Sequence, residues 1–266
     1  MSLSHTTGEI LLREDKEGAV YLTLNRPDKF NTLSEAMLSV LQRELEAIAL
    51  DPAVRCVVIG ANGRGFCAGH DLREMRANPD QAYYQQLFCL CSRVMQSVVA
   101  LPVPVIAKVQ GMATAAGCQL VASCDLAIAG RSASFAVSGI NVGLFCSTPA
   151  VALSRCISPK RAFDMLVSGD FISADTAAEW GLLSAVTDDD DLDAAVADKV
   201  EQVLNKSPAA VRFGKSMFQP QRQMALAEAY DFAGNVMAEN MMSPDAGEGI
   251  DAFLGKRKPL WEQPGH

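Results

Sequence analysis

Two short runs of small residues are the part of this sequence best suited to chemistry. The first is GRGFCAGHDL at residues 63–72, and the second is GMATAAGCQL at residues 111–120. Each follows an apolar run, residues 54–61 and 103–109, that predicts a buried strand. Small residues let a backbone approach a ligand closely and adopt unusual dihedral angles. Two such turns can direct two peptide N–H groups at one developing negative charge, which is the chemistry of an oxyanion hole.

Strands and helices alternate through the first half of the chain. Runs of β-forming residues predict strands, and apolar residues at helical spacing behind Ser34 predict a capped helix. The order repeats roughly every fifty residues, so we expect a layered α/β unit. The predicted strands are residues 9–13, 19–24, 54–61, 103–109 and 125–129, and the predicted helices run from Ser34 to near Asp51, over residues 80–99, and from the second turn through Val121.

After Ser158 the pattern changes and helices dominate. A helical part that follows an α/β body often serves assembly, and one further strand is predicted at residues 182–186. The aspartates at residues 188–191 are expected to cap the helix that follows them, where negative charge is favourable. The predicted helices are residues 159–167, 174–180, 192–204, 209–217, 222–241 and 246–254.

The composition limits the classes of partner. The chain has 266 residues, 49% of them hydrophobic, and a formal net charge of −8. This acidic balance disfavours nucleic acid as a partner, because phosphate binding requires a basic surface. The apolar runs are too short to span a membrane, and residues 1–7 lack a signal-peptide pattern. Eight cysteines without a Cys-x-x-Cys pair, and only three histidines, disfavour disulfides and metal sites. We therefore expect most of the cysteines to be buried free thiols in a cytoplasmic protein.

The two turns resemble the signature loops of the crotonase (enoyl-CoA hydratase/isomerase) family. Several other segments resemble that family in the same order, and together they cover nearly the whole chain. Residues 113–125 and 141–149 are most similar to the subgroup of enoyl-CoA hydratase domain-containing protein 3. The other segments are residues 24–27, 31–33, 124–126, 135–143, 169–174, 181–182 and 253–259.

The resemblance implies a fold, an assembly and a ligand. Residues 1–200 would form an α/β core of ββα units wound into a spiral, and residues 201–266 a C-terminal helical trimerisation region of a homotrimer or a dimer of trimers. The ligand would be an acyl-CoA thioester, with coenzyme A as part of the substrate and no other cofactor or metal. The residues implied to contact coenzyme A are Arg26, Lys29, Phe30, Ala68, Asp71, Leu72, Arg73 and, toward a neighbouring subunit, Phe253 and Lys256.

The same resemblance assigns the thioester carbonyl to the backbone N–H groups of His70 and Ala116. Hydration of a 2-enoyl thioester also needs a base and an acid, which are two glutamates in the family hydratases. These glutamates correspond here to Gln119 and Gly139. Glutamine cannot ionise and glycine has no side chain, so we expect weak hydratase activity. A single lost acid or base commonly costs about a hundred- to ten-thousandfold in rate.

Several functions therefore remain open from the sequence. The chain could be a family enzyme with another proton relay, an acyl-CoA thioesterase, a catalytically inactive acyl-CoA binder with a regulatory role, or a structural or nucleic-acid-binding member, which the acidic balance disfavours. The His70 imidazole could also transfer a proton, since its ordinary pKa is near neutrality. Other polar candidates are Tyr83, Tyr84, Ser138, Asn141, Cys146, Ser147 and Thr148, of which Cys146 has no histidine close in sequence to activate it.

Overall fold

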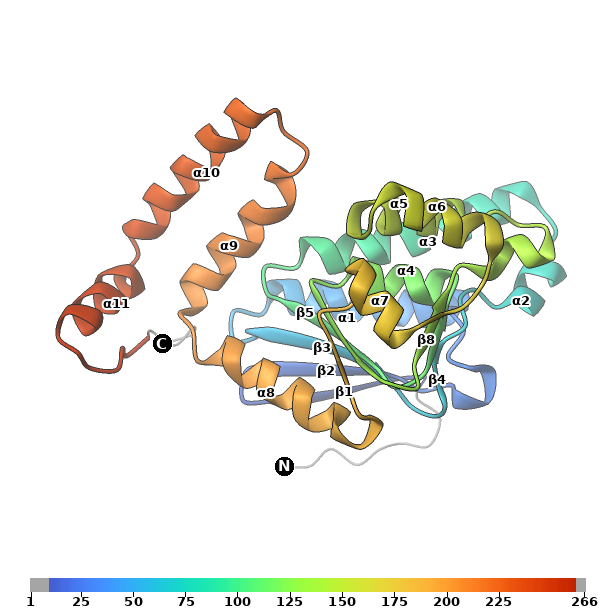
Figure 1. Ribbon diagram of the computed structural model, residues 1–266, viewed down its shortest axis with the longest axis horizontal. Helices are drawn as coiled ribbons and strands as arrows, with labels where there is room; N and C mark the ends of the chain where they lie inside the picture. The colour runs from blue at the N-terminus through green and yellow to red at the C-terminus, as the bar shows by residue number, and fades with distance from the viewer. Residues whose placement is uncertain (1–9, 262–266) are drawn as a thin grey trace.

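Two β-sheets form the centre of the protein. Figure 1 shows a computed structural model, which describes residues 10–261. The larger sheet has six strands, in which β1 and β2 form an antiparallel hairpin and every later pair is parallel. Its strand order is β1 (Leu11–Lys16), β2 (Ala19–Leu24), β3 (Cys56–Ala61), β5 (Val105–Val109), β7 (Leu126–Gly130) and β10 (Ala185–Thr187).

The smaller sheet has four short strands, in the order β4 (Gly65–Cys67), β6 (Met112–Thr114), β8 (Ser134–Ala136) and β9 (Ile172–Ser173). Three times in succession, the chain adds one strand to the larger sheet and the next strand to the smaller one. Each pair of strands leads into helical structure, so the predicted α/β fold of repeated ββα units is confirmed. The helices that follow the three pairs are α2 (Leu72–Ala77) with α3 (Gln81–Ala100), α4 (Ala116–Ser123), and η2 (Ser138–Val142) with α5 (Ser147–Cys156).

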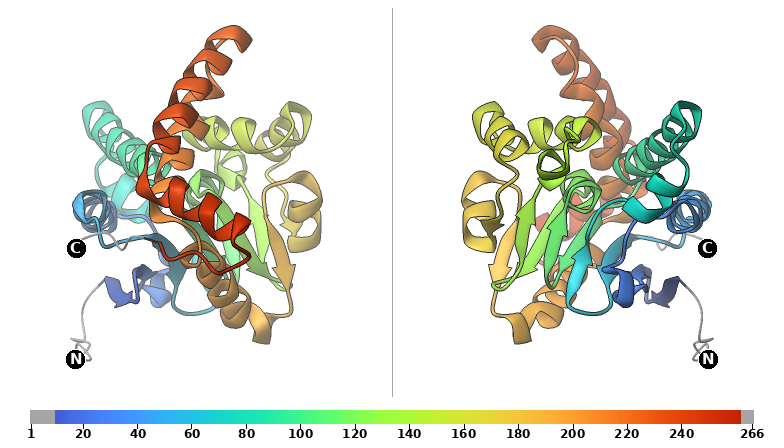
Figure 2. Two further views of the ribbon diagram at one scale, coloured as in Figure 1. Left: turned by 90° about the vertical axis from the view of Figure 1, so that its left-hand side faces the viewer. Right: turned by 90° about the vertical axis from the view of Figure 1, so that its right-hand side faces the viewer.

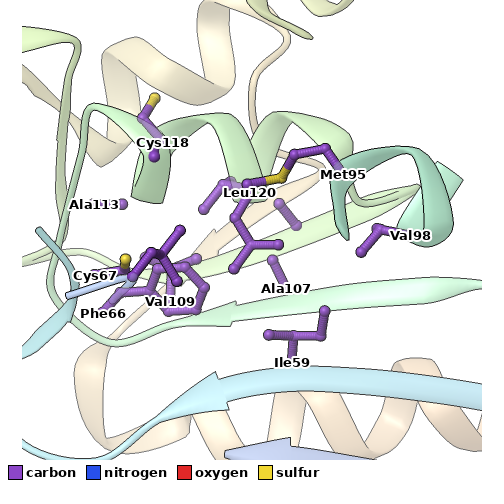
Figure 3. Close-up of a cluster of buried hydrophobic side chains, with 14 of the residues drawn as sticks. Ile59, Phe66, Cys67, Met95, Val98, Ala107, Val109, Ala113, Cys118 and Leu120 are labelled. Carbon is purple, nitrogen blue, oxygen red and sulfur yellow. The ribbon is translucent and has the colours of Figure 1, made fainter. Parts of the chain in front are cut away.

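Both faces of the larger sheet are buried. Alternate residues of β3 point to opposite faces, so Val57 and Ile59 belong to one apolar cluster and Val58 to the other. The first cluster is covered by α1 (Glu35–Leu50), α3 and α4, and the second by α8 (Leu192–Leu204). This explains why β3 and β5 are continuous apolar runs in the sequence. Figure 3 shows Leu120 of α4 packed into the first cluster among side chains of the two sheets.

Helix α4 lies unusually close to β4. A methyl group built on Gly117 would lie 2.1 Å from the carbonyl oxygen of Cys67. Only a residue without a side chain permits this approach. The first turn of α4 is thereby held directly above the end of β4, where the first small-residue turn begins.

The last three helices extend away from the sheets (Figures 1 and 2). They are α9 (Pro208–Gln221), α10 (Leu226–Met241) and α11 (Pro244–Leu254), and no residue of α10 is buried. Their exposed apolar side chains include Leu226, Tyr230, Met237, Phe253 and Leu254. The helical C-terminal region predicted from the sequence is present, and its projecting part begins after α8.

Some elements differ from the sequence prediction. The four strands of the smaller sheet and the helices α2 and α5 were not predicted. Strands of two or three residues carry no readable periodicity. The aspartate run forms the short η3 (Asp189–Asp191), and no side chain caps α8. Instead, the Asp189 carboxylate accepts a hydrogen bond from the Ser132 backbone N–H at 3.0 Å. Of the first predicted strand, Glu9 lies outside the described residues.

The remaining predicted helices are present with small shifts at their ends. Ser34 caps α1 by accepting a hydrogen bond from the Met37 N–H, as predicted. The other elements are η1 (Pro27–Lys29), α6 (Pro159–Ser168) and α7 (Ala174–Trp180). Within residues 10–261, no helix combines the length and apolar character needed to cross a membrane.

The contact between α4 and β4 makes a testable prediction. We expect Gly117→Ala to lower the free energy of unfolding by about 2 kcal/mol, because the added methyl forces helix and strand apart. Gly214→Ala is the matched control, since Gly214 lies inside α9 and a methyl built on it would have no neighbouring atom within 4 Å. That control should gain up to about 1 kcal/mol from helix propensity. Urea unfolding of both variants provides the measurement, and equal stabilities would contradict the close contact.

Candidate active site

The two small-residue turns lie next to each other because their strands are paired. Parallel strands β4 and β6 place Cys67 opposite Ala113. His70 and Ala116 each lie three residues beyond these partners, so both turns leave the sheet at the same edge. A methyl group built on Gly69 would lie 3.2 Å from the Ala116 nitrogen, which shows how closely the turns approach.

Hydrogen bonds hold both turns in place without using the two predicted N–H groups. The Gly69 carbonyl accepts from the Leu33 N–H at 2.8 Å, and the Ala115 N–H donates to the Ala136 carbonyl at 3.0 Å. Ala116 is the first residue of α4, so its N–H has no intrahelical partner. In the loops and turns of residues 10–261, the His70 N–H donates to no backbone carbonyl. Both donors are therefore available to a ligand.

A cavity of about 300 Å³ opens at these two turns. It is mostly apolar, with a few hydroxyl groups and one imidazole, which suits a small organic group with one polar atom. The cavity is lined by Ala68, His70, Leu72, Met75, Phe88, Ala115, Ala116, Ser138, Gly139, Val142, Leu144, Phe145, Cys146, Ser147, Thr148 and Pro149.

The His70 side chain is largely buried in the wall of this cavity. Its Nδ1 lies 3.3 Å from the Leu33 carbonyl oxygen, and its ring meets Phe88 edge to face with centroids 5.4 Å apart. Burial lowers the pKa of the His70 imidazole, and the contact with the Leu33 carbonyl only partly opposes this effect. The neutral ring then donates Nδ1–H to Leu33, which leaves a lone pair on the buried and unpartnered Nε2.

Gln119 and Gly139 occupy different surroundings. Gly139 lines the cavity, but a methyl built on it would lie 2.5 Å from the Leu144 carbonyl oxygen and 2.7 Å from the Cys146 sulfur. This position therefore has no room for a glutamate unless the segment moves. Gln119 is only 4% exposed, its Oε1 has no hydrogen-bond partner, and it lines a second, neighbouring cavity rather than the first.

The residues assigned to coenzyme A are only partly gathered around the first cavity. Ala68 and Leu72 line it, and the Ala68 N–H donates to the Phe30 carbonyl at 3.0 Å, which joins that loop to the turn. The Asp71 carboxylate caps α2 by accepting from the Arg73 and Glu74 N–H groups. Asp71 and Arg73 thus have a clear role in the helix start, whatever else they contact.

The basic residues of the first loop lie at the protein surface. Arg26 donates to the Ser34 hydroxyl at 2.9 Å, and Lys29 ends η1. The guanidinium of Arg64 lies 4.6 Å from the centroid of the Phe30 ring, a cation that sequence analysis did not single out. The sequence could have indicated this cation, because Arg64 lies inside the first small-residue run.

Phe253 and Lys256 are far from this cavity in the same chain. Phe253 belongs to α11, which lies at the opposite end of the molecule from α2 in Figure 1. Phe253 is 83% exposed. Both residues can reach a site of this kind only in another subunit.

Most of the other polar candidates have structural partners. The Ser138 and Thr114 hydroxyls are 2.9 Å apart, and the Tyr84 hydroxyl donates to the Met75 carbonyl. Asn141 points toward the Gly169 carbonyl, outside the cavity lining. Burial raises the pKa of the Cys146 thiol, so it is a poor nucleophile at neutral pH.

The apolar walls were the part that sequence analysis did not find. Phe88 and Met75 come from α3 and α2, and Leu144 and Phe145 come from the irregular segment before α5. Phe88 belongs to a helix with an apolar face, which gave it the same sequence signal as a core residue.

Comparison with known proteins gives consistent matches over almost the whole chain. The family model described as enoyl-CoA hydratase/isomerase matches residues 14–264. Enoyl-CoA hydratase domain-containing protein 3, mitochondrial, of Xenopus laevis is 42% identical over 259 residues, covering 97% of this chain and 87% of the relative.

Two solved structures are also similar. The enoyl-CoA hydratase of Mycobacterium smegmatis has a TM-score of 0.94 and 54% identity, covering 95% of this chain and 99% of its own. Human enoyl coenzyme A hydratase domain-containing protein 3 has a TM-score of 0.93 and 42% identity, covering 95% of this chain and 100% of its own.

The names of the relatives correct one prediction. The similar proteins of Xenopus laevis, Danio rerio, Mus musculus and Homo sapiens are named as mitochondrial. The cytoplasmic location predicted from the sequence is therefore contradicted. The reason is that free thiols report reducing surroundings and do not distinguish one reducing compartment from another.

The buried imidazole predicts a pH-dependent stability. The lowered pKa of His70 means that, below about pH 6.5, the unfolded chain binds a proton that the folded chain does not. The wild type should therefore lose more stability than His70→Asn as the pH falls from about 8 to about 5.5. Urea unfolding of both proteins across this range measures the difference, and a difference that does not change with pH would contradict a neutral buried ring.

The backbone at the start of α4 predicts a strain effect. Ala115 has φ of +50°, a region that favours glycine, so we expect Ala115→Gly to raise the free energy of unfolding by about 1 kcal/mol. Ala116→Gly is the control, because Ala116 begins α4 without a positive φ and buries its methyl, so this variant should lose up to about 1 kcal/mol. A less stable Ala115→Gly variant would show that the turn is not strained.

Proposed function

Because the chain belongs to the enoyl-CoA hydratase/isomerase (crotonase) family, we propose that it binds an acyl-CoA thioester with the carbonyl oxygen between the N–H groups of His70 and Ala116. One observation carries this proposal: two neighbouring backbone donors without protein partners line one apolar cavity. Such donors stabilise the negative charge that develops on the oxygen when the thioester takes on enolate character. Each is worth roughly 3 kcal/mol in a preorganised site.

The proton chemistry differs from that of a hydratase with two glutamates. Of the residues that line the first cavity, only His70 and Cys146 carry a titratable side chain. With Gln119 in place of the first glutamate and no space beside Gly139 for the second, addition of water by two carboxylates is not supported. We propose weak hydratase activity, with His70 as the residue best suited to exchange a proton at the substrate Cα after its ring turns to expose Nε2, which has almost no accessible surface in this structure.

A catalytically inactive acyl-CoA binder is the second candidate. The packing around Gly139 favours it, because no carboxylate can stand there without displacing the Leu144 carbonyl or the Cys146 sulfur. An acyl-CoA thioesterase would need an activated water or nucleophile, and the raised pKa of Cys146 disfavours the latter. Product analysis separates the three functions, since a thioesterase releases free coenzyme A and an inactive binder releases nothing.

We also propose that the protein assembles as a homotrimer or a dimer of trimers. The exposed apolar residues of α10 and α11 support assembly, since such a surface is costly in water. The position of Phe253 and Lys256 supports it too, because these residues would complete the coenzyme site of a neighbouring subunit.

A single methyl group tests the proposed oxyanion hole. Gly69→Ala would place a methyl 2.8 Å from the Ala115 Cβ and 3.2 Å from the Ala116 nitrogen, so it crowds the turn that presents the Ala116 N–H. We expect octanoyl-CoA binding, measured by calorimetry, to weaken at least about tenfold, and any turnover of 2-octenoyl-CoA to fall about a hundredfold.

The control for this experiment is Gly181→Ala. Gly181 has a comparably positive φ of +91°, but the nearest atom to its built methyl is 3.8 Å away and belongs to Cys156. It therefore carries the backbone strain without blocking the cavity. If a folded Gly69→Ala protein binds octanoyl-CoA as tightly as Gly181→Ala does, the carbonyl does not lie where we place it.

A further inference from the structure

A second cavity, of about 640 Å³, adjoins the proposed thioester site. It lies between α3, α4, α5 and α9, and Thr148 lines both cavities. Gln119 lines the second cavity one helical turn beyond Ala116, which lines the first. The second cavity therefore begins beside the place where the thioester carbonyl would bind.

The two ends of this cavity can be placed along helix α5. Thr148 lies at the start of α5 and Arg155 near its end, seven residues or about 10 Å along the axis. Arg222, the residue that follows α9, joins this far end, because its guanidinium donates to the Arg155 carbonyl at 2.6 Å. Both arginines line the cavity, whose walls between the two ends are largely apolar and include Met95 and Val151.

The two arginines lack acidic partners. Among residues 10–261, neither Arg155 nor Arg222 forms an ion pair. The only carboxylate that lines the cavity belongs to Asp125, and it is already engaged by the Lys215 ammonium and the Val105 N–H. Both arginines are solvent-exposed, so the far end of the cavity opens to water and carries two cations that pair with no protein carboxylate.

The near end also has an unused polar group. The Oε1 atom of Gln119 is buried without a hydrogen-bond partner, although the residue is only 4% exposed. This oxygen has almost no accessible surface, so a group in the cavity could reach it only after the Gln119 side chain turns.

We propose that this cavity holds the acyl chain of the thioester and that Arg155 and Arg222 bind a carboxylate at the end of that chain. The substrate class is then an acyl-CoA whose chain ends in a carboxylate rather than a methyl group. A guanidinium presents paired N–H donors that match a carboxylate, and the apolar walls match the methylene chain. This inference rests on the proposed function, because it places the same thioester in the first cavity.

Two thioesters of equal length test the inference. Suberoyl-CoA has as many acyl carbons as octanoyl-CoA and ends in a carboxylate. By calorimetry at low salt, we expect the wild type to bind suberoyl-CoA at least about tenfold more tightly, the size of one charge-assisted hydrogen bond. In Arg155→Gln with Arg222→Gln, this preference should disappear while octanoyl-CoA affinity stays within about threefold.

Controls keep the experiment decisive. Arg161→Gln is the matched control, since Arg161 pairs with Glu179 and stacks on Trp180 away from the cavity, and it should retain the preference. If the double variant fails to fold, Arg155→Gln is tested alone. We expect it to fold, since the Arg155 guanidinium donates to the Val151 carbonyl of its own helix, and it should reduce the preference at least about threefold.

The outcomes separate this inference from the proposed function. If the wild type binds both thioesters equally well, or prefers octanoyl-CoA, the carboxylate-ended class is wrong and the proposed function stands. If the variants keep the full preference, the two arginines are not its source. If the wild type binds neither thioester, the proposed function itself fails.

Discussion

The parallel pairing of β4 with β6 is the contact on which the rest of the site depends. Its register, with Cys67 opposite Ala113, brings two turns from distant parts of the chain to one edge of the smaller sheet. Gly117 lets α4 press against the Cys67 carbonyl, and this fixes the helix start above that edge. The geometry of the candidate site is therefore set by main-chain atoms. Side chains then shape the cavity around it.

The sequence was sufficient to predict this main-chain arrangement but not the cavity walls. The glycines at 63, 65, 69, 111 and 117 mark the turns, since close approach and positive φ restrict those positions to small residues. The walls come from Phe88 and from residues 144–145, whose sequence signal is the same as that of core or loop residues elsewhere. Gly139 was aligned to a catalytic glutamate, but the steric limit imposed by Leu144 and Cys146 depends on tertiary packing that no local pattern records.

The side chains and amides at the two ends of the proposed ligand differ in charge. The thioester end would be served by neutral groups, two donating amides and an imidazole that keeps a lone pair on Nε2 and whose pKa is lowered by burial. The far end of the acyl chain would be served by full charges, Arg155 and Arg222. Neutral donors suit a site where charge appears only during reaction, because they need no counter-ion in the resting state. Permanent cations suit the recognition of a permanent anion.

The carbonyl stretching frequency of a bound thioester tests the central claim most directly. Isotope-edited infrared spectra of octanoyl-CoA, labelled at the thioester carbonyl, report the hydrogen bonds to that one oxygen. We predict that the band moves to lower frequency on binding to the wild type and stays near its free value in whatever fraction binds to Gly69→Ala. A bound thioester whose carbonyl band is unshifted in the wild type would contradict the convergence of the two amides on that oxygen.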